Sequence, residues 1–65
     1  MTDTIHVAGM SCEGCEETVE DALTDVAGVT AATADRETAQ ATVEGDAEPA
    51  DLVAAVEQAG YDASA

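Results

Sequence analysis

The chain contains no tryptophan and no phenylalanine, and Tyr61 is its only aromatic residue. Many of its apolar residues are alanines, which bury little area, so the core of this 65-residue chain is expected to be small. Folds of this size often need a metal, a disulfide or a partner for stability. A chain of this length makes one domain at most, and we expect a single domain over residues 1–65.

The chain also lacks lysine, and Arg36 is its only arginine against fifteen aspartates and glutamates, a formal net charge of −14. A charge of this sign repels nucleic acid and anionic membrane surfaces, which argues against both as partners. In dilute salt the chain repels itself, whereas about 1 M salt shortens the Debye length to about 3 Å. We therefore predict a halophilic source, in which the acidic surface serves solubility; an acidic protein of a non-halophilic organism is the alternative.

Long apolar runs are absent too. Residues 1–5 have no basic start, and no apolar run of signal-peptide length follows them. Nowhere does the chain approach the roughly 20 apolar residues that span a bilayer, so we expect no membrane insertion. These features predict a cytoplasmic protein, in which a pair of cysteines more often serves metal binding or redox chemistry than a structural disulfide.

The first half of the chain has a strand pattern followed by a helix pattern. In residues 4–9, Ile5 and Val7 alternate with polar neighbours, which is typical of a half-buried strand. From about residue 13 to residue 27 the period becomes that of an amphipathic helix. Its apolar stripe consists of Val19, Ala22, Leu23 and Val26. Ser11 is the predicted N-cap of this helix, and Gly28 is predicted to end it.

The second half predicts a hairpin, a helix and a last strand. Residues 29–35 and 39–45 alternate on either side of a short polar turn, which favours an antiparallel hairpin. Pro49 suits the first turn of a second helix that runs to about Gln58, and Gly60 suits its end. Residues 61–65 form a short strand or a frayed tail. The resulting order predicts an α+β, ferredoxin-like βαββαβ fold, with two helices on one face of a four-stranded antiparallel sheet.

The only two cysteines, Cys12 and Cys15, lie in the stretch AGMSCEGC. A disulfide between them would close too short a loop to restrain the unfolded chain much. The predicted elements place Cys12 in the loop after the first strand and Cys15 in the opening turn of the helix, whose positive end favours a thiolate. The nearby acids Glu13, Glu16 and Glu17 act in the opposite direction.

Four interpretations of this pair are open. Two buried, inert thiols are the simplest. A dithiol–disulfide oxidoreductase fits the spacing, although thioredoxin-like folds are longer. A tetrahedral zinc site needs four ligands, and the chain offers two cysteines and His6, which points outward on its strand. Cu(I) is soft and can be held by two sulfurs alone, which leaves it open to a third thiolate from a partner.

The string GMSCEGC at residues 9–15, with GV at 28–29 and AGYDA at 59–63, resembles the heavy-metal-associated domain family. That family includes small Cu(I) metallochaperones and the N-terminal metal-binding domains of copper-transporting P-type ATPases. The resemblance covers residues 4 to about 63 and implies that Cys12 and Cys15 bind the metal. It also implies that Met10 packs beneath the loop without binding metal and that Tyr61 lies near the loop. Zinc- or cadmium-linked members often carry Asp where this chain has Ser11, so Ser11 favours copper.

The resemblance implies a metal-transport protein and not an enzyme. Cu(I) would be held between the two thiolates and passed by ligand exchange to a copper-transporting P-type ATPase or another CxxC protein. Hg(II), Zn(II) and Cd(II) are alternative cargoes, because related proteins share the motif. The start at Met1 and the lack of a trailing linker favour a free-standing chaperone. An excised domain of a copper ATPase is the alternative. Two copies could also share one copper, as a metal-bridged homodimer.

Overall fold

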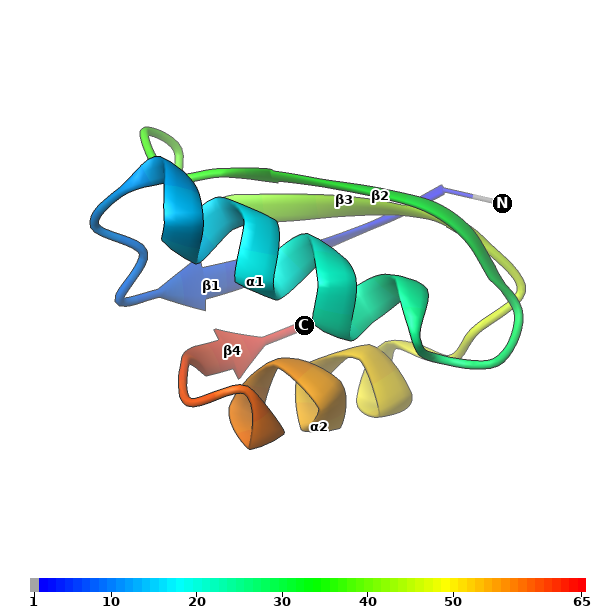
Figure 1. Cartoon of the computed structure of the whole chain (residues 1–65). Helices are drawn as coiled ribbons and strands as arrows, with labels where there is room; N and C mark the ends of the chain where they lie inside the picture. Colours follow the sequence, from blue (N-terminus) through cyan, green and yellow to red (C-terminus); the bar gives the residue numbers. More distant parts are fainter. Residues whose placement is uncertain (1) are drawn as a thin grey trace.

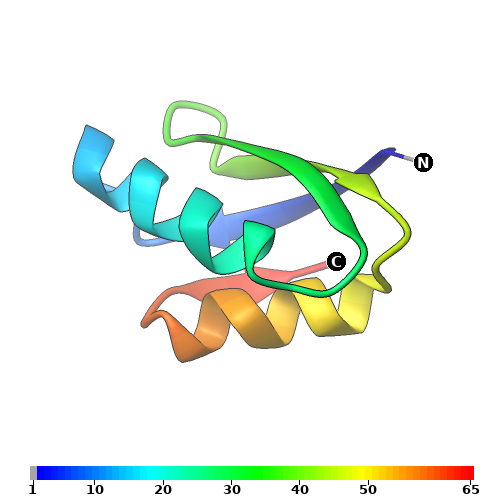
Figure 2. The same ribbon diagram turned by 45° about the vertical axis from the view of Figure 1, so that its right-hand side comes forward.

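A computed structural model describes residues 2–65 of the chain. Its elements are β1 (Thr2–Ala8), α1 (Glu13–Thr24), β2 (Val29–Asp35), β3 (Gln40–Gly45), α2 (Pro49–Gln58) and β4 (Asp62–Ser64). The strands form one antiparallel sheet in the order β2-β3-β1-β4. Both helices lie on the same face of this sheet (Figure 1), and the turned view in Figure 2 shows the same two layers. The predicted ferredoxin-like fold is confirmed.

The alternation in β1 sorts its side chains between the two faces of the sheet. Ile5 and Val7 are buried beneath the helices, whereas His6 is exposed on the opposite, open face. β1 occupies a central position, paired with β3 on one side and with β4 on the other. The loop that leaves its end therefore starts from the interior of the sheet, and this loop carries Cys12 into the start of α1.

The core is small and wholly apolar, as the composition predicts. Within residues 2–65 no polar or charged side chain is buried. Two of the alanines, Ala34 and Ala41, are buried opposite each other in the β2–β3 pair. The remaining core side chains come from both layers: Ile5, Val7, Val19, Leu23, Val43, Leu52 and Val56. Neither of the helices described is long and apolar enough to cross a bilayer.

Two predictions about α1 are wrong in detail. The helix ends at Thr24 instead of near Ala27, because the backbone then tightens: the N–H of Val26 donates to the carbonyl of Leu23, three residues back, at 3.1 Å. At the other end the N-cap is Cys12, in an extended conformation, and no side chain caps the helix. Ser11 lies one position too early to cap it, which leaves the hydroxyl of Ser11 close to the thiols.

Candidate metal centre

Cys12 precedes α1 and Cys15 lies in its first turn. Figure 1 shows that β1 leads into α1 at one end of the molecule. Cys12 is exposed and Cys15 half-buried, both are free thiols, and their Sγ atoms lie 3.4 Å apart. The carbonyl of Cys12 accepts the N–H of Cys15 at 3.1 Å and that of Glu16 at 3.3 Å, which closes the first helical turn. This turn brings two sulfurs three positions apart in the sequence to one point on the surface.

Cys15 is the thiol that the fold activates. Its pKa is lowered to about 6, first by a hydrogen bond from the side chain of Tyr61 and next by the backbone of Ser11. The side chains of Cys12 and Ser11 add to this effect, and burial opposes it. Hydrogen bonds to a thiolate favour the charged form, so Cys15 is mainly a thiolate at neutral pH. The interaction with Cys15 in turn raises the pKa of Tyr61.

Three further residues named from the sequence lie around the thiols. Met10 is half-buried and packs against the core, as does Tyr61. Ser11 lies beside the pair, with its Oγ 3.8 Å from the Sγ of Cys15. The ring of Tyr61 also covers Gly9, whose φ is +96°: a Cβ at Gly9 would lie 3.6 Å from the Cδ1 of Tyr61. The roles of Met10, Ser11 and Tyr61 toward a metal stay predictions.

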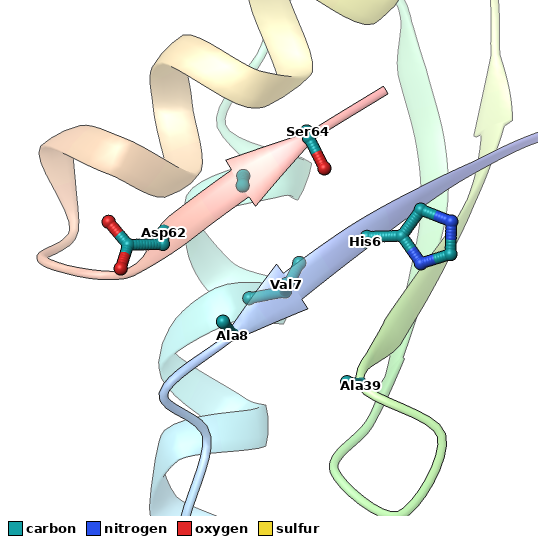
Figure 3. A pocket seen from close by; sticks show the side chains of 7 residues that line it. His6, Val7, Ala8, Ala39, Asp62 and Ser64 are labelled. Atoms are coloured by element: carbon teal, nitrogen blue, oxygen red, sulfur yellow. The ribbon is translucent and has the colours of Figure 1, made fainter.

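His6 lies apart from the thiols. It faces Ser64 across the β1–β4 pair, and with Ala8, Ala39 and Asp62 it borders a shallow hollow of about 290 Å³ (Figure 3). Within residues 2–65, no three side chains of the His, Cys, Asp and Glu types come together where they could hold a metal. In that part of the chain the donor set is therefore the two sulfurs alone, which does not suit an intramolecular tetrahedral zinc site.

Comparison with known proteins agrees with this geometry. The sequence profile of the heavy-metal-associated domain matches residues 4–62. The chain belongs to the heavy-metal-associated domain family. The copper chaperone CopZ of Staphylococcus saprophyticus is 39% identical over 64 residues, which cover 94% of each chain. Copper-transporting ATPase 2 of Rhizobium meliloti is 44% identical over 57 residues, and this stretch covers 85% of the present chain but 7% of the ATPase. A solved structure of a CopZ metallochaperone superposes with a TM-score of 0.93 at 34% identity, over 98% of this chain and 100% of that one.

In this member of the heavy-metal-associated domain family, one contact beside the thiols was missed by the sequence reasoning. The sequence pattern presents Glu16 as an acid that suits the positive end of the helix and disfavours a thiolate beside it. In the structure its Oε2 accepts the N–H of Arg36 at 2.7 Å, and its Oε1 lies 3.7 Å from Nη1 of the same arginine. Arg36 lies twenty residues further along the chain, so no local pattern could have connected the two.

Proposed function

We propose that the protein is a Cu(I) metallochaperone, in which Cys12 and Cys15 hold the metal and pass it to a partner. The observation that carries this proposal is the pair of free sulfurs 3.4 Å apart at the surface, one of them with a pKa lowered to about 6. The names of the relatives support it, since they include a copper chaperone and a copper-transporting ATPase. The protein would act as a carrier in the cytoplasm and would catalyse no reaction.

The chemistry of the two sulfurs suits a soft ion. Thiolate–metal bonds are about 2.3 Å long for zinc, so sulfurs 3.4 Å apart both lie within reach of one ion of similar size. Thiolates select Cu(I), whereas the many carboxylates on the surface are hard ligands that suit Mg²⁺ or Ca²⁺. Because Cys15 is already mainly a thiolate at neutral pH, binding need displace few protons from it. Hg(II), Zn(II) and Cd(II) are competing cargoes that the experiment below compares.

Transfer would proceed by exchange of thiolates, without any change in oxidation state. A thiolate of the partner adds to Cu(I), which becomes three-coordinate, and one of the chain's own metal–sulfur bonds then breaks. Cys12 is the more exposed of the two cysteines, so its bond is proposed to break first, and its sulfur then takes up a proton. A second thiolate of the partner displaces Cys15. A partner with its own CxxC site meets this requirement, such as a copper-transporting P-type ATPase.

The two relatives named above differ in the share of their length that this chain covers. The chain spans 94% of the CopZ relative and 7% of the ATPase relative. We propose a single domain over residues 1–65 that acts as a metallochaperone, and a metal-binding domain of a copper-transporting ATPase is the alternative. Sharing of one copper by two copies is a further prediction, which sedimentation at half an equivalent of Cu(I) checks.

The first experiment is an anaerobic titration of the reduced protein with Cu(I) in high KCl, against a chromogenic Cu(I) chelator. One Cu(I) per chain, held firmly enough to compete with the chelator, is expected, with Zn²⁺ binding much more weakly in a parallel run. Cys12→Ser and Cys15→Ser should each lose this competition. Weak Cu(I) binding by the folded wild-type protein would overturn the proposal, and normal copper delivery by Cys15→Ser would overturn the exchange mechanism.

A dithiol–disulfide oxidoreductase is the second candidate, and the pKa of Cys15 favours it. A value of about 6 lies in the range of redox-active cysteines at helix N-termini. The two functions differ in turnover, because an oxidoreductase reduces insulin disulfides catalytically when a reductant is supplied and a carrier does not. Catalytic insulin reduction, combined with weak Cu(I) binding, would select this second function.

A further inference from the structure

Two carboxylates of α1 accept hydrogen bonds from the backbone of β2, an edge strand of the sheet, and of the turn that follows it. The N–H of Ala34 donates to Oε2 of Glu20 at 2.8 Å, and the N–H of Arg36 donates to Oε2 of Glu16 at 2.7 Å. Backbone N–H groups on a sheet edge otherwise face solvent or attract another strand. Here the helix supplies charged acceptors to them, so α1 is fastened to β2 by hydrogen bonds as well as by apolar packing.

The spacing of the two bonds follows from the geometry of the elements. Four residues of helix rise about 6 Å, and two residues of strand advance about 6.6 Å, so the steps nearly match. The earlier glutamate, Glu16, bonds to the later residue, Arg36, because α1 and β2 run in opposite directions. Glu16 makes one contact more, since its Oε1 lies 3.7 Å from the guanidinium of Arg36. The side chain of Glu16 is 22% exposed and that of Arg36 36% exposed.

The position of Glu16 gives this bond a consequence for the thiols. Glu16 directly follows Cys15, and its own N–H donates to the carbonyl of Cys12. No side chain caps α1, so the first turn of the helix lacks its usual anchor. The side chain of Glu16 supplies an anchor of another kind, which reaches from this turn to the β2–β3 hairpin.

We propose that Glu16 is a positioning residue for the dithiol: it fastens the first turn of α1 to Arg36 and thereby holds Cys12 and Cys15 at their separation. The expected effect on Cu(I) binding rests on the proposed function, whereas the expected effect on the position of the thiols does not. Glu20 makes the same kind of bond one turn further from the cysteines, so it contributes to packing but not to the position of the thiols. It is therefore the matched control.

Three variants separate the anchor from the charge. Glu16→Ala removes both the acceptor oxygen and the negative charge, whereas Glu16→Gln removes the charge and keeps an oxygen that can accept the N–H of Arg36. The difference between these two variants thus measures the anchor alone. Glu20→Ala removes the corresponding bond to Ala34 and shows what a purely structural loss does.

The first measurement is amide hydrogen exchange of the reduced, metal-free protein in high KCl. The amides of Cys15 and residue 16, which bond to the carbonyl of Cys12, are expected to exchange about tenfold faster in Glu16→Ala than in Glu16→Gln. In Glu20→Ala they should exchange as in the wild type. Equal rates in Glu16→Ala and Glu16→Gln would overturn the proposal. If Glu16→Ala does not fold, Glu16→Asp, whose carboxylate is one methylene shorter, takes its place against the wild type.

The second measurement is competition for Cu(I) with the chromogenic chelator. Groups that orient metal ligands typically affect affinity by about tenfold or more, so Glu16→Ala should bind Cu(I) about tenfold more weakly than Glu16→Gln. Glu20→Ala should bind Cu(I) as tightly as the wild type, even if it unfolds more easily. If Glu16→Ala and Glu20→Ala lose the same affinity for Cu(I), Glu16 has a packing role only and the proposal is overturned. If the exchange rates differ as expected while the wild type binds no Cu(I), the metallochaperone proposal fails and the role of Glu16 stands.

Discussion

The side chain of Tyr61, in the turn between α2 and β4, lowers the pKa of Cys15, which lies in the first turn of α1. Hydrogen bonding by Tyr61 is the largest cause of this shift. A hydrogen-bond donor stabilises the charged form of a thiolate, and the partial positive charge at the N-terminus of a helix favours the same form. The reactivity of the thiol pair therefore depends on a residue near the other end of the chain.

Replacement of Tyr61 by phenylalanine keeps the ring and removes the donor. We expect Tyr61→Phe to raise the pKa of Cys15 from about 6 toward the ordinary thiol range near 8.5. The measurement is the pH dependence of iodoacetamide alkylation, with the modified cysteine identified by mass spectrometry. The midpoint for Cys15 should move to higher pH, while a urea melt confirms that the fold persists. An unchanged midpoint would show that the hydroxyl does not control the thiol.

The lowered pKa of Cys15 also predicts how stability depends on pH. A group whose pKa is lower in the folded protein stabilises it fully above the unfolded pKa, near 8.5, and loses this contribution as the pH falls to about 6. Cys15→Ser removes the titrating group. The difference in unfolding free energy between wild type and Cys15→Ser should therefore shrink as the pH is lowered from about 9 to about 6. Urea denaturation of both reduced proteins across this range checks it, and a constant difference would contradict it.

Gly45, the last residue of β3, lies against Gly28, in the loop before β2, at the end of the molecule away from the thiols. A Cβ on Gly45 would overlap the carbonyl oxygen of Gly28, and the φ of Gly45 is +134°. Gly45→Ala should cost about 3 kcal/mol or more, because the obstructing atoms belong to the backbone. A small core supplies only about 3–5 kcal/mol in total, so this variant should be largely unfolded.

Gly60→Ala is the matched control for Gly45→Ala. Gly60 also has a positive φ, of +100°, but a Cβ there would meet nothing within 4 Å. The variant should lose only the cost of the left-handed backbone, about 1–2 kcal/mol. Urea melts followed by circular dichroism compare the two. Similar losses in both variants would mean that the contact with Gly28 adds nothing.

The net charge of −14 predicts a steep dependence of stability on salt. Between about 0.1 M and about 1 M KCl the Debye length falls from about 10 Å to about 3 Å, which screens repulsion among the exposed carboxylates. The urea midpoint should rise over this interval. Asp21→Asn combined with Glu57→Gln, two exposed positions on separate helices, should reduce the salt dependence. Equal stability at both salt concentrations would remove the argument for a halophilic source.

Local patterns in the sequence determined the elements and the identity of the thiol pair. The alternation of Ile5 and Val7 and the stripe through Val19 and Leu23 depend only on neighbours within a turn or a pleat, so they predicted β1 and α1 without knowledge of the fold. The same reasoning was wrong for the cap, because Ser11 and Cys12 differ by one position and local preference alone favours serine.

The tertiary structure alone decided which distant groups act on the thiols. The effect of Tyr61 on the pKa of Cys15 and the bond between Glu16 and Arg36 connect residues far apart in the sequence. Their geometry depends on the order β2-β3-β1-β4, which places the hairpin and the α2–β4 turn at the end of the sheet that carries the cysteines. The contact of Gly45 with Gly28 arises in the same way. The sequence motif thus identifies the two sulfurs, whereas the tertiary structure determines the pKa of Cys15 and the contacts around the pair.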